Sequence, residues 1–538
     1  MNKEQKIQVG ILVDSVNVQA WVYQSIEHIL TLDGVKICCV MVDPSQPSTL
    51  PFKSMQQRLS RLLGKLFDGD ISGPDYRQRK TITSLLGVPR YTLDDEVRVS
   101  VVNDHKADVL IKYTNHELVN DNALDLKYGV WDHLFNAGVT HRAGYEGFWE
   151  TLLSQPEVGS SLRASYVPLR DQQSVELIRS YSCTQEASIY GTNNGNYWKS
   201  SSFAARMLKR MVAGGDGFFS QLSSQLDSQQ ELSVGYEHSA PSNFQYATLL
   251  AKKVFAKIKK KIKYKQYFEQ WFLLYNLNPE TSNDMSSFIK LLPPKEVFWA
   301  DPHVIFENNK YYIFIEELPF ATDKGYLSVI EMDLDGQYTQ PEKILEKDYH
   351  LSYPNVFKYK DEYYMIPETF DNSTIELYRC VGFPSQWEFV MNLMEGMQAA
   401  DTTLHFHDNK WWLFTSIMEN KGASPHDELF LFYTDGDFLT TQWTPHPLNP
   451  IVSDVKTARP AGKIYTEHGK IYRPSQNCSH HYGYGVNLNE IMVLNETEYQ
   501  EKIVVSIEPD WDKDVIATHS YSKVKDLVVM DGIILRKN

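Results

Sequence analysis

The chain has 538 residues, more than one ordinary hydrophobic core supports, so we expect two or three domains. Its 42% hydrophobic and 13% aromatic residues indicate a globular protein, and its net charge of −15 argues against a general nucleic-acid binder, which needs a basic face. Five cysteines without metal-ligand spacing predict a reducing compartment, no disulfide framework and no metal site. The sequence has neither a signal peptide nor 18 consecutive apolar residues, which predicts a cytoplasmic protein.

The N-terminal part has the pattern of an α/β domain. Residues 8–14 and 35–42 are apolar runs typical of buried strands, and residues 17–32 between them have helical periodicity. Residues 54–67 predict a basic amphipathic helix, and 108–113 another buried strand. No glycine-rich phosphate-binding pattern follows any predicted strand.

From residue 130 onward, the order of motifs resembles the N-terminal domain of the formyltransferase family. His133 matches the family's histidine, Trp131 stands where the family has its asparagine, and the late aspartate is Asp171 or is replaced by Arg170. The resemblance implies a Rossmann-type fold for residues 1–213. It also implies a remnant site at His133, Trp131 and Asp171 that would use 10-formyltetrahydrofolate. Formyl transfer needs an amide at position 131 to hold the oxyanion, so a degenerate binding domain is the favoured interpretation.

Residues 214–274 are predicted to link the domains. The stretch from 214 to 245 is rich in Gly, Ser and Gln, as linkers are. It leads into a lysine-rich helix at residues 251–265, followed by aromatic residues. Such a helix can lie on an anionic membrane surface, at the inner face of the membrane for a cytoplasmic protein. The alternative is a solvated helix between domains, the more common use of a charge run.

A strand-rich repeat fills residues 275–538. Each copy has an apolar strand, a polar turn and a second apolar strand. The copies start at equivalent positions roughly 50 to 60 residues apart, a period typical of propeller blades. These five positions are Asp301, Tyr353, Asp401, Arg459 and His519. The sequence therefore predicts a five-bladed β-propeller.

Equivalent positions on successive blades face a common axis, so these five side chains are predicted to meet there. Glu316 and Glu368 occupy equivalent positions farther along the first two blades. Carboxylates in a polar funnel are how sugar-active propellers work, and Asp301, Glu368 and Asp401 are our predicted catalytic residues. The predicted substrate-binding residues are Arg459, Tyr353, Glu316, His519, His480 and His481. The structural alternative is that an aspartate at a strand start only caps a turn.

Several ordered motifs in this region resemble a known family. They are Trp299-Ala-Asp-Pro302, Tyr353-Pro-Asn-Val356, Met365-Ile-Pro-Glu-Thr369, Trp411-Trp-Leu-Phe414, Ala458-Arg-Pro460 and Arg473-Pro-Ser-Gln-Asn477. They are similar to the N-terminal propeller domain of glucosamine inositolphosphorylceramide transferase and, more distantly, to five-bladed glycosidases of the arabinanase and invertase type. In the ceramide transferase the recognised glycosyltransferase module is a separate domain. The third blade departs from the glycosidase pattern, with Ala400-Asp-Thr-Thr403 in place of Arg-Asp-Pro.

We favour an enzyme that transfers or cleaves a glycosyl unit in the propeller funnel. The resemblance implies a role in making a surface polysaccharide or glycolipid, with a glycan or glycolipid as substrate. One alternative is a folate-dependent amino-sugar N-formyltransferase, with the propeller presenting the sugar. The other is a non-catalytic glycan-binding scaffold.

Overall fold

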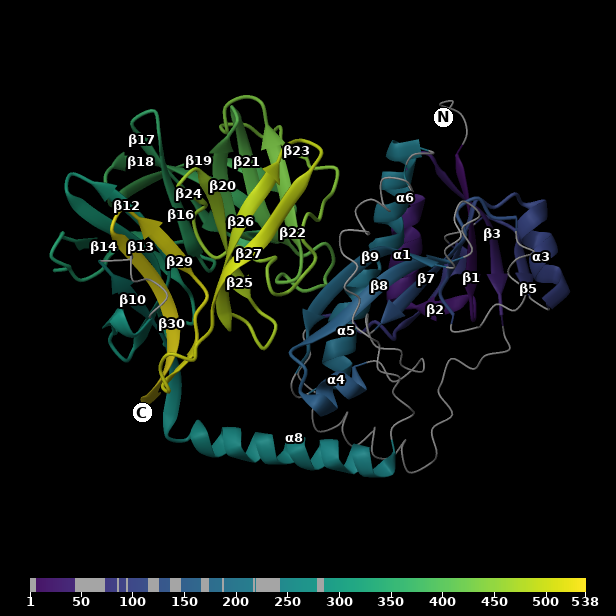
Figure 1. Cartoon of the computed structure of the whole chain (residues 1–538), viewed down its shortest axis with the longest axis horizontal. Coiled ribbons are helices and arrows are strands. Elements are labelled where there is room, and N and C mark those ends of the chain that lie inside the picture. The colour runs from purple at the N-terminus through teal and green to yellow at the C-terminus, as the bar shows by residue number, and fades with distance from the viewer. Residues whose placement is uncertain are drawn as a thin grey trace. The chain divides into compact units, whose positions relative to one another are not determined.

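The computed structural model describes most of the chain, and Figure 1 shows its elements. The described ranges are 6–43, 73–84, 87–92, 95–114, 125–135, 147–165, 174–185, 188–215, 218, 242–277 and 285–538. The predicted helix at 54–67, residues 219–241 of the linker, and residues 170 and 171 lie outside these ranges. Two compact units divide within one helix, between Val254 and Phe255.

The N-terminal unit is built on a seven-stranded sheet (Figure 1). Five strands are parallel, and the last two run antiparallel to their neighbours. Their spatial order is β5 (Arg90–Thr92), β3 (Val35–Val42), β1 (Ile7–Val13), β6 (Val109–Lys112), β7 (Val130–Phe135), β8 (Glu157–Ser165) and β9 (Ser174–Cys183). A separate ribbon pairs β2 (Asn17–Gln19) with β4 (Arg79–Thr81). The predicted α/β domain and its first strand–helix–strand unit are therefore present.

Both faces of this sheet are covered, which explains why its central strands are nearly all apolar. Ile11 packs in one hydrophobic core and Leu12 in another, as the alternation of a strand requires. The helices are α1 (Ala20–Leu30), α3 (Asp95–Asp104), α4 (Phe148–Leu153), α5 (Ile189–Ser200) and α6 (Phe203–Gly214). The first core includes residues of α1, α5 and α6, and the second includes residues of α3.

The predicted propeller is present as five antiparallel sheets (Figure 1). Blade 1 contains β12 (Val297–Glu307), β13 (Lys310–Pro319), β14 (Tyr326–Met332) and β15 (Glu342–Leu345). Blade 2 contains β16 (Ser352–Tyr359), β17 (Glu362–Glu368), β18 (Thr374–Gly382) and β19 (Gln386–Glu395). Blade 3 contains β20 (Ala399–His407), β21 (Lys410–Ile417), β22 (Leu429–Thr434) and β23 (Thr444–Pro445). Blade 4 contains β24 (Tyr465–Glu467), β25 (Lys470–Asn477), β26 (Gly485–Leu494) and β27 (Tyr499–Ile507).

The fifth blade joins the two ends of the propeller sequence. It contains β10 (Tyr267–Asn276), β11 (Ile289–Leu291), β28 (Val515–Ala517), β29 (Tyr521–Val524) and β30 (Leu527–Lys537). β10 runs antiparallel to β30 along its whole length, from Tyr267 opposite Lys537 to Asn276 opposite Val528. The propeller therefore begins at residue 267 and not at about 275, because its first strand lies within the stretch assigned to the linker.

A helix, α8 (Asn243–Lys263), precedes β10 and is longer than the predicted 251–265 at its N-terminal end. No helix within the described ranges is long and apolar enough to cross a membrane.

The closing strand gives a test of the corrected boundary. A fragment of residues 266–538 should unfold in one cooperative thermal transition, because all five blades are complete. A fragment of residues 277–538 lacks β10 and with it the buried residues Phe272, Leu273 and Leu274. The edge of β30 that pairs with β10 is then left exposed. It should aggregate or melt without cooperativity. Equal melting curves for the two fragments would show that β10 is dispensable.

Candidate functional site

The first strands of blades 1, 2 and 3 carry the same irregularity at the predicted ring positions. Pairing between the first and second strand skips a residue after Ala300, Ser352 and Ala400, which is a β-bulge in each blade. Asp301, Tyr353 and Asp401 follow these residues, with φ angles of 52°, 44° and 52°. A positive φ is unfavourable for non-glycine residues, and Asp tolerates it better than Tyr.

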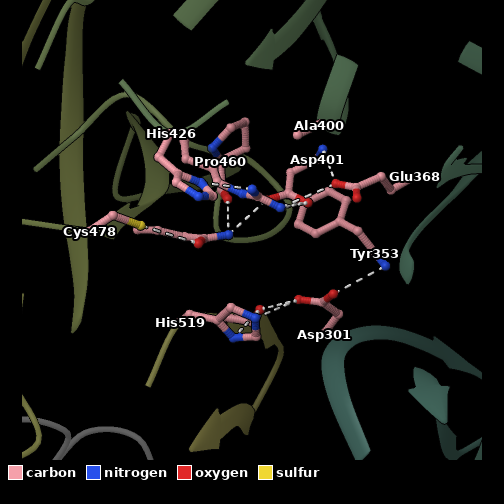
Figure 2. Close-up of polar contacts among 12 residues, drawn as sticks. Asp301, Tyr353, Glu368, Ala400, Asp401, His426, Pro460, Cys478 and His519 are labelled. Carbon is pink, nitrogen blue, oxygen red and sulfur yellow. Dashed lines mark hydrogen bonds and ion pairs between the residues drawn. The ribbon is translucent and has the colours of Figure 1, made fainter. Parts of the chain in front are cut away.

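The backbone N–H at each bulge is held by a carboxylate of the preceding blade. Asp301 N donates to Asp531 Oδ2 at 3.0 Å, and Tyr353 N donates to Asp301 Oδ2 at 3.2 Å. Asp401 N donates to Glu368 Oε2 at 3.1 Å (Figure 2). These buried amides would otherwise lack partners, so the carboxylates also join neighbouring blades. Repetition of this contact explains why acidic residues recur at the ring.

Arg459 binds two of the predicted catalytic carboxylates. Its Nε lies 2.5 Å from Asp401 Oδ2, and its Nη2 lies 3.3 Å from Asp401 Oδ1 and 3.2 Å from Glu368 Oε2. Nη1 contacts His426 Nδ1 at 2.9 Å, and Gln476 Nε2 donates to Asp401 Oδ2 at 2.7 Å. Most of the guanidinium's hydrogen-bonding capacity is thus used within the protein. Arg459 is the counter-ion of Asp401 and Glu368, and its predicted contact with substrate stays a prediction.

A second buried chain of charges joins the last blade to the first. His519 Nδ1 lies 2.7 Å from Asp531 Oδ2, and His519 Nε2 lies 3.5 Å from Asp301 Oδ1. The His519 ring stacks on Trp271 at a centroid distance of 4.0 Å. Burial lowers the pKa of His519, but Asp531 and Asp301 outweigh it and raise this pKa to about 9. His519 is therefore a cation at neutral pH, held between two carboxyl groups.

Asp301, His519 and Asp531 could also supply ligand atoms to a metal ion, since one such atom from each lies within 4.8 Å of the others. Asp531 already accepts hydrogen bonds from the backbone N–H groups of Asp301, His519 and Ser520, besides its contact with the imidazole. These contacts account for its position without an ion, and the cluster carries no metal assignment.

Glu368 divides its contacts unequally between its two oxygens. Both of the hydrogen bonds that it accepts, from Asp401 N and Arg459 Nη2, are made by Oε2, and Oε1 accepts none from the described residues. Burial, and then the charge of the neighbouring Asp401 carboxylate, raise the pKa of Glu368 well above its usual range. Glu368 is thus the group best suited to keep a proton at neutral pH.

Asp301 is buried and fully engaged. Its Oδ1 accepts from Ser520 Oγ at 2.8 Å, and its Oδ2 accepts from Tyr353 N. Burial raises the pKa of Asp301 to about 7, against the opposing effect of His519. Asp301 therefore changes its charge near neutral pH.

Of the other predicted residues, Tyr353 and Glu316 are buried, and His480 and His481 are exposed. Tyr353 is buried and crosses the axis, because its hydroxyl meets both Thr403 Oγ1 at 2.7 Å and Gly462 N at 2.8 Å. Glu316 lies opposite Ala300, as Glu368 lies opposite Ser352, so the predicted equivalence is correct. Glu316 Oε1 is 3.2 Å from His350 Nε2.

His480 and His481 are exposed and lie beside Tyr484, at ring-centroid distances of 4.2 and 5.6 Å. The next residue along the chain, Tyr482, is 42% exposed. Its ring centroid is 5.0 Å from the Arg459 guanidinium carbon and 5.4 Å from the His519 ring. Tyr482 is therefore an aromatic surface next to the buried charges.

Sequence reasoning missed four residues of this network. They are Asp531, Gln476, His426 and Tyr482. Asp531 lies within the weakest repeat, and Gln476 within a motif that we used only for resemblance. The pair Asp531-Gly532 did carry a signal, because a charged residue inside an otherwise apolar strand needs a buried partner.

The predicted remnant site in the N-terminal unit is placed only in part. Trp131 is fully buried and donates through Nε1 to Tyr128 O at 3.0 Å. His133 lies between the rings of Trp21 and Tyr113, and burial lowers its pKa to about 3. Asp171 lies outside the described residues. Trp131 therefore serves as core, and the formyltransferase-like character of this unit stays a prediction.

Comparison with known proteins identifies relatives of the propeller. Residues 290–523 match the family described as "Glucosamine inositolphosphorylceramide transferase 1, N-terminal". The chain is 33% identical over 207 residues to glucosamine inositolphosphorylceramide transferase 1 of Oryza sativa subsp. japonica, and 31% identical over 207 residues to that of Arabidopsis thaliana. Each match covers 38% of this chain and 27% of the relative. The match thus spans about a quarter of the length of these curated relatives.

Solved structures with some similarity include Zg3597, a family 117 glycoside hydrolase of Zobellia galactanivorans, and an exo-1,5-alpha-L-arabinanase from a bovine ruminal metagenomic library. The first has 10% sequence identity and a TM-score of 0.33, and covers 50% of this chain and 90% of the hydrolase. The second has 15% identity and a TM-score of 0.32, and covers 46% of this chain and 95% of the arabinanase.

The position of Arg459 predicts a large stability effect. Arg459→Met would leave Asp401 and Glu368 without their counter-ion in a buried site. It should lower the free energy of propeller unfolding by about 3–5 kcal/mol. Denaturant unfolding at neutral pH measures this change. The matched control is Arg379→Met. Arg379 is 46% exposed and lies 3.7 Å from Glu362, and an exposed ion pair of this kind contributes less than about 1 kcal/mol. Equal effects of the two substitutions would contradict the buried counter-ion.

His519 predicts a pH dependence of stability. Its folded-state pKa is raised to about 9 from 6.5, so its contribution is complete below pH 6.5 and is lost as the pH rises through 9. Between these values, wild-type stability should fall by at most about 1.4 kcal/mol per pH unit from this group. His519→Gln should flatten that fall, whereas His481→Gln on the exposed loop should not. The measurement is the denaturant midpoint from pH 6 to 10. Parallel curves for wild type and His519→Gln would show that His519 is not charged in the fold.

Proposed function

We propose that the propeller is the catalytic part of a protein that transfers a glycosyl unit in glycolipid synthesis. The family matched by residues 290–523 is named for transfer to inositolphosphorylceramide, and it supports a glycolipid substrate. Cytoplasmic location, at the inner face of a membrane, belongs to the same proposal. The single observation that carries the catalytic assignment is the unused oxygen of Glu368, described above.

Glu368 acts as the general acid in this proposal. Its raised pKa keeps the carboxyl protonated at neutral pH. Oε2 accepts two hydrogen bonds from the protein, so the proton belongs on Oε1, which faces no protein donor among the described residues. From there it passes to the oxygen of the departing group as the glycosidic bond breaks, while the acceptor hydroxyl bonds to the anomeric carbon and releases its proton to water. Arg459 and the Asp401 amide fix the carboxyl group for this transfer.

Asp301 and Asp401 supply negative charge to the same step. Glycosyl transfer passes through a transition state with positive charge on the sugar ring, which nearby carboxylates stabilise. Asp401 is fixed by Arg459 and Gln476, and Asp301 by Ser520 and the Tyr353 amide. Asp301 loses its proton near pH 7, so the rate should rise through neutral pH. It should fall at a higher pH, where Glu368 loses its proton.

Tyr482 and the two histidines beside it form the side from which we propose that the sugar enters. An exposed aromatic ring next to convergent polar groups is the usual composition of a ligand site. The ring faces buried Arg459 and His519 on one side and is partly open to solvent on the other.

Glu368→Gln tests the acid while sparing the fold. The amide oxygen can keep both bonds now made by Oε2, and the amide nitrogen replaces the unused Oε1. We expect a loss of turnover of about 100-fold or more and a melting temperature close to that of the wild type. The assay follows the transfer of glucosamine from an activated donor to inositolphosphorylceramide in detergent micelles.

The control is Glu362→Gln at the opposite end of the same strand, where the side chain is 50% exposed. It should retain full activity. Asp301→Asn is a poorer test, because an amide nitrogen would face either the Tyr353 N–H or the Ser520 hydroxyl and lower stability. Full activity in Glu368→Gln would remove the acid assignment, and saturable binding without turnover would indicate a glycan-binding scaffold.

A further inference from the structure

Helix α8 has exposed apolar side chains, most of them in its C-terminal half. Phe244, Val254, Phe255, Ile258 and Ile262 are between 38% and 79% exposed. Four of them lie in the last ten residues of the helix, where every residue before Lys263 is exposed. Exposed apolar residues in such a group mark an interaction surface more often than single ones do. We call these five residues the α8 stripe.

The same helix packs in the ordinary way through a different face. In its N-terminal half, Tyr246 and Leu249 are buried in a cluster with Phe148, Trp149 and Leu152 of α4. Lys253 is buried on the same side, one turn farther along. The face needed for packing is thus already occupied.

Helix geometry separates the two faces. At about 100° per residue, the five residues of the stripe fall within an arc of roughly 100°. Tyr246, Leu249 and Lys253 fall within an arc of about 60° centred on nearly the opposite side. A helix that only linked two domains through solvent would need no second apolar face.

Lysines border the stripe on both sides. By the same geometry Lys252, Lys259 and Lys263 lie next to one edge and Lys261 next to the other. No Asp or Glu occurs anywhere in the 21 residues of the helix. This strong local positive charge contrasts with the net charge of −15 of the whole chain. A surface that attracts this segment must therefore be anionic and must offer an apolar layer to the stripe.

We propose that the C-terminal half of α8 lies in the interface of an anionic lipid bilayer. The stripe enters the boundary between headgroups and acyl chains, and the lysines contact the anionic headgroups. A second copy of the chain is a poorer partner, because its own lysines would meet these lysines. The helix is too charged to span the bilayer and so lies in the plane of the membrane.

This position would place the propeller beside the membrane. Only Tyr264, Lys265 and Gln266 separate the end of α8 from β10, the strand that closes the ring. A glycolipid headgroup would then be within reach of the propeller. The lipid-binding inference rests on the helix alone and holds whether or not the propeller is catalytic.

The test is co-sedimentation of the full chain with vesicles of phosphatidylcholine containing about 30% phosphatidylserine, compared with phosphatidylcholine alone. We expect binding to the anionic vesicles only. Replacing Lys259 and Lys261, the exposed lysines at the two edges of the stripe, by Gln should weaken it at least about tenfold, since each lysine near the surface contributes about fivefold. Raising the salt from about 0.1 M to 1 M should weaken wild-type binding similarly, because the Debye length falls from about 10 to 3 Å.

A second variant isolates the apolar contribution. Phe255→Ser, Ile258→Ser and Ile262→Ser together should also lower binding by about tenfold or more while keeping every lysine. The matched control replaces Lys36 and Lys513 by Gln, two exposed lysines outside the helix, and should bind like the wild type. Melting temperatures should be unchanged in all three variants, because their side chains are exposed. A soluble activity or ligand-binding assay should also be unchanged, which distinguishes failure here from failure of the catalytic proposal.

Three outcomes would overturn the inference. One is an absence of binding to anionic vesicles by the wild type, and another is binding that neither variant reduces. The third is a concentration-dependent dimer of the wild type that the serine variant abolishes, which would assign the stripe to an interface between two copies.

Discussion

The pairing of β10 with β30 is the constraint on which the propeller depends. Ten residues from the start of the repeat region lie antiparallel to the last strand of the chain. Without this pairing the fifth blade would be incomplete and the first and last blades would not be neighbours. Asp301 of the first blade could not then meet His519 and Asp531 of the last. The site is therefore a property of the closed ring, and no single blade contains it.

Closure also explains why so many charges can be buried together. Each carboxyl group has a definite partner: Asp531 has His519 and three backbone amides, Asp401 has Arg459 and Gln476, and Glu368 has Arg459 and one amide. Such partners are what make ionised or polar groups tolerable in a protein interior. The bulges supply the amides, because each leaves one N–H outside the regular ladder.

The sequence was sufficient for the period, the number of blades and the five ring positions, because these depend on local patterns that repeat. It was also sufficient for an α/β unit at the N-terminus, but not for the formyltransferase-like site, of which Trp131 has become core. The start of the propeller at Tyr267 was missed because β10 has no repeat partner nearby in sequence and pairs with residues 528–537 instead. The role of Arg459 was missed for a similar reason: nothing local to Arg459 shows that Asp401 and Glu368 already occupy its guanidinium. Long-range pairing, in backbone and in charge, was the information that sequence patterns lacked.

The contacts of Glu368 differ from those of the other acidic residues that join the blades. The recurrent amide-to-carboxylate bond between blades is a structural device, and on its own it would explain Asp531 and Asp301. Asp531 fits that explanation completely, because its contacts lie within the protein, and Asp301 fits it nearly as well. Glu368 does not fit this explanation. Its bond between blades uses Oε2 alone, and the fold does not require Oε1 to accept a hydrogen bond. A serine stands at the equivalent position of the third blade, Ser416, so the fold does not require a carboxylate at this place in every blade. A buried acid with an oxygen that the fold does not use is what distinguishes Glu368 from its structural neighbours.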